Sequence, residues 1–271
     1  MTNLELLFRD LGFTYKQYRS VVDDKQITLK EDTLYKTFLN NVSLFLHGGV
    51  KQEEIVKLVM SNHNITYLDL NKKVELFNDL GYNDELFFGM LKKCPKLVNL
   101  SENNIKMTID NLRGLGYDED ILKKMIIECP ELLQYDFKRI ENRFNEFKKF
   151  NYTNDQIIKI TAGYPGVIGT EEKRFKTKLA YYNSIGLHDY IVQRPKDLIQ
   201  SVELTHARYQ FFIDNDIEIN KTTQQSLFKK ESSFIKQYGI SKSVLLKLYN
   251  FSTYINSIKD NSVKKKTITL K

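Results

Sequence analysis

The chain has 271 residues, of which 41% are apolar, 28% are charged and only four are proline. This composition is sufficient to bury a continuous core and excludes a mainly disordered chain. Residues 1–130 carry 17 basic and 19 acidic side chains, whereas residues 131–271 carry 24 basic and 15 acidic ones. A basic half that follows a nearly neutral half favours a polyanionic partner.

The cysteine count and the apolar runs indicate where the protein resides. Cys94 and Cys129 are too few for a disulfide framework and indicate a reducing compartment. No apolar run approaches the roughly 20 residues that a membrane-spanning helix needs. The N-terminal segment has too short an apolar run for a secretory signal, and its Glu5 and Asp10 are unlike an acid-poor transit peptide. We therefore expect a soluble intracellular monomer, in a mitochondrion or chloroplast only if a leader has been removed.

A Gly, Asn or Asp residue recurs at a nearly fixed interval along the chain. In chain order the series is Gly12 in LGF, Gly48 in HGGV, Gly81 and Gly116 in LGY, Asn151 in FNY, Gly186 in IGL and Asp216 in NDI. From Gly81 onward the steps are 35, 35, 35 and 30 residues, while the first two members are spaced more loosely. Gly and Asn accept left-handed backbone where a helix ends, and Asp tolerates it less well. Each member of this series, which we call a landmark, therefore predicts a helix C-terminus.

The stretch before each landmark has the apolar spacing of a helix. Apolar side chains recur eleven, seven and four residues before the landmark, and this spacing places them on one helical face. In the five clearest repeats the residues at these positions, with Thr205 as the one exception to the apolar pattern, are Leu70, Val74 and Phe77; Ile105, Ile109 and Leu112; Ile140, Phe144 and Phe147; Phe175, Leu179 and Tyr182; and Thr205, Tyr209 and Phe212. We expect this face to lie in the core.

A second helix follows each landmark and ends at a proline. Candidate N-caps for this helix are Asn83-Asp84, Asp118 and Asn154-Asp155. The prolines are Pro95 in CPKLV, Pro130 in CPELL, Pro165 in YPGVI and Pro195 in RPKDL, at steps of 35, 35 and 30 residues. A proline disfavours helix at the residue before it, which explains the stop. One repeat is thus a helix of about 14 residues, a tight turn, a helix of about 10 and a Pro-x-Leu-Leu turn.

An apolar helix ending in LGY, a second helix and then CPELL or CPKLV resembles the repeats of the mitochondrial transcription termination factor (mTERF) family. The resemblance is clearest over residues 60–216, and it depends on recurrence and spacing. It implies an all-α solenoid of about seven repeats, a curved half-ring that holds double-stranded DNA, sometimes RNA, against a basic concave face. It also implies a role in transcription termination, gene expression or ribosome assembly. We expect the solenoid over residues 1–260 and a basic tail over residues 261–271, which contain Lys264, Lys265, Lys266 and Lys271.

Basic residues recur at one repeat position, eight residues before the landmark. This column reads Lys73, Thr108, Arg143, Lys178 and Arg208. It lies about 60° from the centre of the apolar stripe, and in stacked repeats its members would form a ladder. A row of Lys and Arg suits the regularly spaced phosphates of a duplex. The alternative is that these side chains lay their alkyl stems over the edge of the core and reach water.

A second column, twelve residues before the landmark, is basic only in two middle repeats, at Arg139 and Arg174. Arg194 lies in the same positive half. Because arginine can contact a phosphate with two parallel hydrogen bonds, we add these three arginines to the predicted nucleic-acid-binding residues. A solvated, salt-bridged helix face is the alternative for each of them.

The sequence contains no pattern that predicts catalysis or a cofactor. The four histidines, His47, His63, His188 and His206, are scattered singly, and no Ser/His/Asp or HExxH arrangement is present. The cysteines precede two of the prolines and lack further ligands at metal-binding spacing, so buried small side chains are the better interpretation. We expect a protein that is not an enzyme and that needs no metal or cofactor.

The leading hypothesis is a helical-repeat protein that binds double-stranded DNA. Two alternatives remain open from the sequence. A solenoid also presents long surfaces to protein partners, which gives a protein–protein scaffold. An RNA-binding factor for RNA processing or ribosome assembly would differ only in its ligand.

Overall fold

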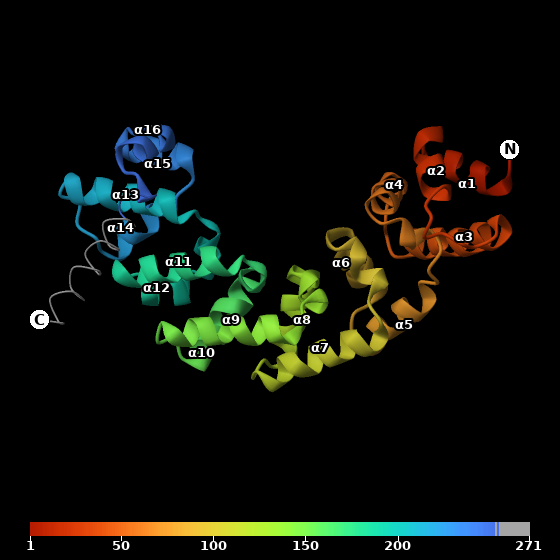
Figure 1. Cartoon of the computed structure of the whole chain (residues 1–271), viewed down its shortest axis with the longest axis horizontal. Helices are drawn as coiled ribbons and strands as arrows, with labels where there is room; N and C mark the ends of the chain where they lie inside the picture. The colour runs from red at the N-terminus through yellow and green to blue at the C-terminus, as the bar shows by residue number, and fades with distance from the viewer. Residues whose placement is uncertain (253, 255–271) are drawn as a thin grey trace, which may run out of the picture. The chain divides into compact units, whose positions relative to one another are not determined.

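The computed structural model describes residues 1–252 and residue 254. This part of the chain contains 16 α-helices, five short 3-10 helices and no strand (Figure 1). The expected all-α fold is therefore confirmed. The chain divides into two compact units, Met1–Asn142 and Arg143–Lys271, and the boundary falls inside helix α9 (Phe137–Lys149). The predicted tail, residues 261–271, lies outside the described residues.

The first unit contains four helix pairs and the start of α9. Its elements are α1 (Asn3–Asp10), α2 (Tyr15–Val22), α3 (Glu31–His47), α4 (Gln52–Ser61), η1 (His63–Thr66), α5 (Asn71–Asp79), α6 (Asp84–Lys93), η2 (Pro95–Asn99), α7 (Glu102–Gly114), α8 (Glu119–Glu128) and η3 (Pro130–Gln134). Here α5 packs on α6 and α7 on α8, as expected for helix pairs. Each η element is a 3-10 helix, and η2 and η3 are the predicted proline turns.

The second unit contains the rest of α9 and three further complete pairs. Its elements are α10 (Asn154–Gly163), η4 (Pro165–Gly169), α11 (Glu172–Ser184), α12 (His188–Gln193), η5 (Pro195–Ile199), α13 (Val202–Asp214), α14 (Lys221–Ser226), α15 (Glu231–Tyr238) and α16 (Lys242–Leu248). The pair α15–α16 lies beyond the last predicted landmark, so the described residues hold eight pairs. The sequence signal missed this pair because no proline precedes or follows it.

The landmarks end the first helices as predicted. Gly81, Gly116 and Gly186 have φ of +82°, +98° and +74°, and the non-glycine landmarks Asn151 and Asp216 have φ of +64° and +53°. In the repeat at Gly81, the following N–H of Tyr82 donates to the carbonyl of Phe77 at 2.8 Å, and the two rings lie 5.8 Å apart. A hydrogen bond of this kind with an apolar contact across it is the Schellman ending of a helix.

One landmark was placed a residue too early. The left-handed residue after α3 is Gly49, with φ of +77°, whereas Gly48 is the C-cap with φ of −79°. Gly48 is small for another reason: a Cβ at this position would lie 2.0 Å from the Phe88 ring. The adjacent glycines therefore have separate roles, and spacing alone did not distinguish them.

The short fourth step has a local cause. Helix α12 has 6 residues where α8 and α10 have 10. In addition, its N-cap Leu187 directly follows the landmark Gly186, whereas the N-cap Asp118 stands two residues after Gly116. Together these differences account for a repeat that is 30 rather than 35 residues long.

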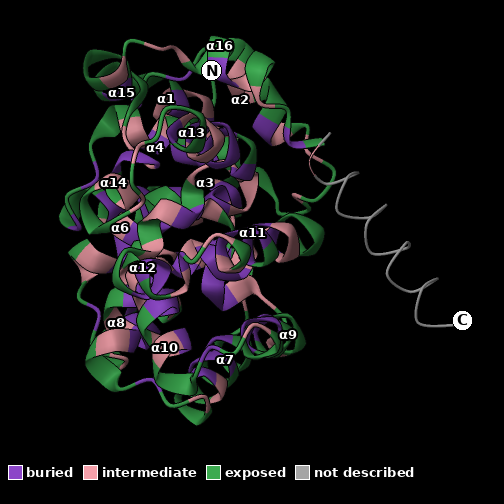
Figure 2. Cartoon of the chain, turned by 90° about the vertical axis from the view of Figure 1, so that its left-hand side faces the viewer, coloured by how far each residue is buried: buried purple, intermediate pink, exposed green. Residues whose placement is uncertain are grey.

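The predicted apolar face is the buried face. Fourteen of its fifteen members are buried, including Thr205, and only Tyr209 is partly exposed. Figure 2 shows the buried residues as stripes along the helices, with exposed residues on the opposite sides. The N-caps Asn83 and Asp118 are also confirmed, while α10 is capped by Thr153 in a capping box with Gln156 rather than by Asn154.

Candidate nucleic-acid interface

The column eight residues before the landmark points toward the junction between one repeat and the next. Its cations donate to main-chain carbonyls near the end of the following short helix: Lys73 to Leu100, Arg143 to Thr170, Lys178 to Leu198, and Arg208 to Leu227 and Lys229. Carbonyls at a helix C-terminus lack partners within the helix and carry partial negative charge, so a cation is favoured there. At these four positions the column links the first helix of its repeat to the turn that precedes the next repeat.

Arg143 and Arg208 also contact an aromatic ring of the next first helix. The Arg143 guanidinium carbon lies 3.8 Å from the centroid of the Phe175 ring in α11. That of Arg208 lies 4.2 Å from the centroid of the Phe234 ring in α15. A guanidinium over a ring is attracted by the ring's negative face, the more so away from water. Each arginine therefore connects three segments of its unit.

Because Gly49, and not Gly48, is the left-handed residue after α3, the column gains a member that sequence reasoning missed. Asn41 stands eight residues before Gly49 and is fully buried. Its amide nitrogen donates to the carbonyls of Ile65 and Leu68 at 2.9 and 2.7 Å, and its oxygen accepts from the Leu70 N–H. A neutral amide thus makes the contact that Lys or Arg makes in other repeats.

Burial removes most of the column from solvent. Arg143, Lys178 and Arg208 have only 5%, 4% and 1% of their surface exposed, and Lys73 is partly buried. Desolvation lowers the pKa of Lys178 to about 8, with the nearby Arg174 charge acting in the same direction, and lowers the pKa of Arg208 to about 10. The column does not form the exposed ladder that we expected. A position at the edge of the apolar stripe can face either solvent or the adjoining turn, and here it faces the turn.

Arg139 and Arg174, of the second column, are exposed. Arg139 is in the first turn of α9, in the first unit, and its guanidinium lies 4.5 Å from the Tyr135 ring centroid. Arg174 is in the first turn of α11, in the second unit, beside the exposed Lys173. The α11 N-terminus itself is occupied, because Glu171 accepts hydrogen bonds from the N–H groups of Lys173 and Arg174. An anion would therefore meet side-chain cations here rather than free backbone N–H groups.

Arg194 is exposed but forms an ion pair. Its Nε donates to Oδ2 of Asp197 at 3.0 Å, and the Tyr190 hydroxyl donates to the same oxygen at 2.6 Å. The hydrogen bond and the charge of Asp197 raise the pKa of Arg194. A phosphate at Arg194 would have to compete with this carboxylate.

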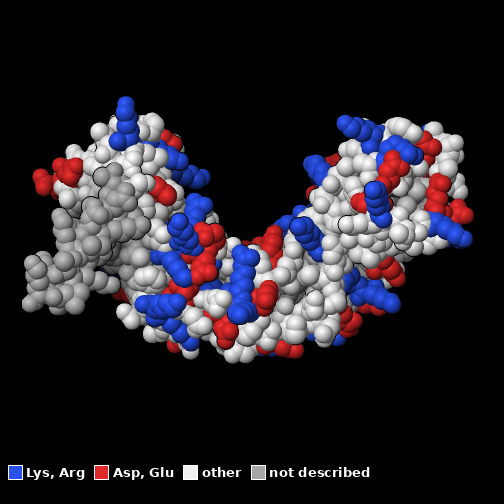
Figure 3. Space-filling model, in the orientation of Figure 1, with Lys and Arg blue, Asp and Glu red and all other residues white. Residues whose placement is uncertain are grey.

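In the second unit, Lys149 and Lys176 form a small basic cluster around Glu146, a grouping that sequence reasoning did not predict. Glu146 has only 7% of its surface exposed, and its Oε1 lies 2.7 Å from Lys149 Nζ and 3.4 Å from Lys176 Nζ. Burial alone would raise the pKa of Glu146, but the two ammonium groups lower it below its usual value. On the face of this unit seen in Figure 3, basic and acidic residues are interspersed.

The two cysteines are largely removed from solvent. Cys94 is buried and Cys129 partly buried, and burial raises the pKa of both thiols, that of Cys129 to about 12. Within the described residues, no three His, Cys, Asp or Glu side chains are grouped as metal ligands would be. None of the helices described there is long and apolar enough to cross a membrane.

Comparison with known proteins identifies the repeat. The model of the mTERF family matches residues 7–234, from the first helix pair into α15. No curated protein matches the sequence. The match covers most of the chain, including every proline turn and every column residue from Asn41 to Arg208. The chain therefore belongs to the mTERF family of nucleic-acid-binding helical-repeat proteins.

Proposed function

We propose that this protein is a non-enzymatic factor that binds double-stranded DNA through its phosphates and acts in transcription termination or in the regulation of gene expression. The proposal goes beyond family membership in naming the ligand, the contacts and the process. It assigns the contacts to exposed cations, above all Lys173 and Arg174 on α11. Arg139 on α9 supplies a contact in the first unit.

The observation that carries the proposal is the surplus of cations outside the core of the second unit. Residues 143–254 contain 17 Lys and Arg and 11 Asp and Glu. When the buried cations Arg143, Lys178 and Arg208 and the buried Glu146 are left out, 14 cations and 10 carboxylates remain. Neutralising phosphates with such cations releases condensed counterions, which is the main source of affinity for DNA backbone.

The first turn of α11 supports the proposal more specifically. Lys173 and Arg174 are adjacent and exposed, and no ion pair is described for either within the structure. Arginine can form two parallel hydrogen bonds to one phosphate, whereas lysine acts as a point charge. Arg194 ranks below both because Asp197 already holds it.

Fluorescence anisotropy with one labelled sequence, presented as duplex DNA, duplex RNA and single-stranded DNA, tests the proposal. If about four phosphates are contacted, the log–log salt slope for duplex DNA is about −3.6, or about a 100-fold loss of affinity between 50 and 200 mM salt. Duplex DNA should bind most tightly. A slope near zero, or tighter binding of duplex RNA, would contradict the assignment of DNA as the ligand.

A further inference from the structure

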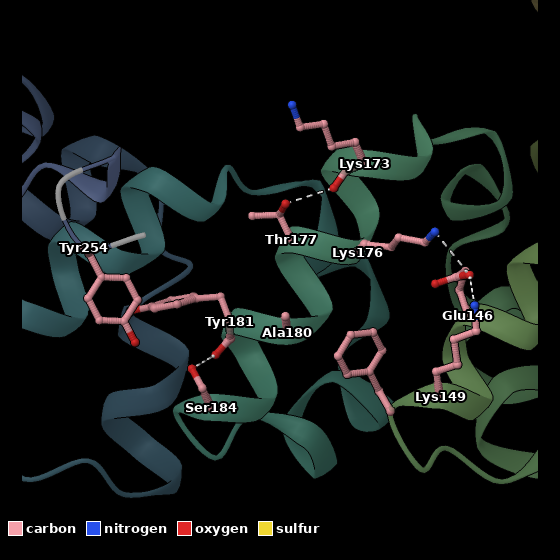
Figure 4. Close-up of a pocket in the computed structure, with 10 residues that line it drawn as sticks. Glu146, Lys149, Lys173, Lys176, Thr177, Ala180, Tyr181, Ser184 and Tyr254 are labelled. Atoms are coloured by element: carbon pink, nitrogen blue, oxygen red, sulfur yellow. Dashed lines mark hydrogen bonds and ion pairs between the residues drawn. The ribbon is translucent and has the colours of Figure 1, made fainter. Parts of the chain in front are cut away.

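A cavity of about 730 Å³ opens on the second unit between α9, α11 and Tyr254 (Figure 4). Small-molecule sites in proteins have volumes of about 300–1,000 Å³, so this cavity is large enough for such a ligand. It is lined by side chains of the two first helices α9 and α11 together with Phe150 and Tyr254. The proposed contact with DNA shares Lys173 with this lining and uses none of the other lining residues.

The two sides of the cavity differ in chemistry. On one side, Lys149 and Lys176 reach toward Glu146 (Figure 4). On the other side, the rings of Tyr181 and Tyr254 pack edge to face, with their centroids 5.7 Å apart. Ala180 lies between the two sides, and its small side chain leaves the space open. The lining is largely apolar, and two of its three ammonium groups, those of Lys149 and Lys176, lie beside Glu146.

The charges of the lining favour a ligand with a single negative charge. Lys149, Lys173 and Lys176 contribute three ammonium groups, and Glu146 contributes one carboxylate. Glu172, outside the cavity, forms a second ion pair with Lys176. The surplus is thus close to one positive charge, centred on Lys173, for which no ion pair is described in this unit. A polyphosphate would need more cations than the cavity offers.

We propose that this cavity binds a small amphipathic monoanion, a carboxylate with an apolar body. The carboxylate lies at Lys173, and the apolar body lies over Ala180 against the rings of Tyr181 and Tyr254. The body is either an aliphatic chain or an aromatic ring system, and both fit an apolar wall next to a cation. The inference does not depend on the proposed binding of DNA.

Isothermal titration calorimetry with octanoate and with naphthoate, each paired with the corresponding neutral alcohol, tests this site. The wild-type protein is expected to bind at least one acid saturably with one-to-one stoichiometry and its alcohol about tenfold more weakly. Preference for octanoate or for naphthoate then identifies an aliphatic or an aromatic ligand. The absence of saturable binding of either acid, or equal binding of acid and alcohol, would overturn the proposal.

Two variants locate the site. Ala180→Trp fills the cavity and should weaken binding of the acid at least about tenfold. Asn145→Trp, at an exposed position of α9 outside the lining, is its matched control and should bind like the wild type. Equal binding by Ala180→Trp and wild type places the ligand elsewhere and overturns the proposal.

Lys173→Gln provides an independent test if circular dichroism shows that Ala180→Trp does not fold. This substitution is at an exposed position and should weaken binding of the acid while leaving that of the alcohol unchanged. If neither ligand is affected, the assigned carboxylate position is wrong and the proposal fails. DNA binding is measured separately by anisotropy, so the two proposals can fail independently.

Discussion

Asn41 and Arg208 occupy the same position in their repeats, and each donates a 2.9 Å hydrogen bond to a main-chain carbonyl, that of Ile65 or that of Leu227. One side chain is neutral and short, and the other is charged and long. In these two repeats the position is therefore filled by a hydrogen-bond donor that reaches the junction between repeats, with or without a positive charge. This structural contact accounts for Arg208 without a ligand.

Replacing Arg208 with methionine tests the structural role of the column. Arg208→Met removes the donor for two carbonyls, including that of the buried Leu227, and should lower the free energy of unfolding by about 1–3 kcal/mol. Urea denaturation followed by circular dichroism measures this change. Arg174→Met, at an exposed position, is the control and should change stability by no more than about 0.5 kcal/mol. Equal stabilities of the two variants would show that the junction does not depend on Arg208.

The buried Lys178 predicts a dependence of stability on pH. Its pKa is about 8 in the folded protein, against 10.5 for an exposed lysine. Between these values the unfolded chain binds a proton that the folded chain does not, so the free energy of unfolding rises with pH across this range. Lys178→Met lacks this contribution. The stability of the wild type minus that of Lys178→Met should therefore increase from pH 8 to pH 10.5 in urea titrations. A constant difference would mean that the ammonium group is not desolvated.

The landmark Asp216 predicts a stabilising substitution. An L-residue in left-handed backbone costs about 1–2 kcal/mol, whereas glycine adopts it readily. Because Asp216 has φ of +53°, Asp216→Gly should raise the free energy of unfolding by about 0.5–1 kcal/mol. Asn145→Gly, at an exposed helical position of α9, should instead lower it. Thermal unfolding of both variants gives the sign of each change in stability. A lower stability of Asp216→Gly would contradict the account of the landmarks.

Adding a methyl group at Gly48 should destabilise the protein, in contrast to the stabilising substitution at Asp216. A Cβ at Gly48 would overlap the Phe88 ring, so Gly48→Ala should destabilise the protein by about 1–3 kcal/mol. At Gly114, in the last turn of α7, an added Cβ would meet no atom within 4 Å, and Gly114→Ala should be neutral or stabilising. Chemical denaturation of the Gly48→Ala and Gly114→Ala variants measures both changes in the free energy of unfolding. Similar effects of both substitutions would show that Phe88 moves aside at little cost.

Reversing two exposed charges tests the proposed contact with DNA. The double variant Lys173→Glu, Arg174→Glu should weaken duplex binding and make the salt slope less negative by about 1 for each lost phosphate contact. Glutamates in the first turn of α11 suit the helix dipole, so folding should be retained. Lys16→Glu with Lys25→Glu makes the same change in net charge at exposed positions of the first unit. If both double variants weaken binding equally, the effect is one of net charge and not of α11.

The sequence predicted the repeat more reliably than the site. The landmarks, the proline turns and the buried face follow from local backbone preferences and apolar spacing, and these agree with the structure from Gly81 to Asp216. The error at Gly48 arose where two glycines are adjacent. The pair α15–α16 was not predicted because no proline follows Gly239, the left-handed residue that ends α15.

The period, the ends of the helices and the identity of the buried face were determined by the sequence itself, because each depends on a few neighbouring residues. The direction of the column and the burial of Glu146 were decided only by tertiary structure. An edge position such as that of Arg143 has two environments within reach of one long side chain, solvent and the carbonyl of Thr170. Which of them it occupies depends on a turn 27 residues away in the chain, and helical periodicity contains no information about that distance.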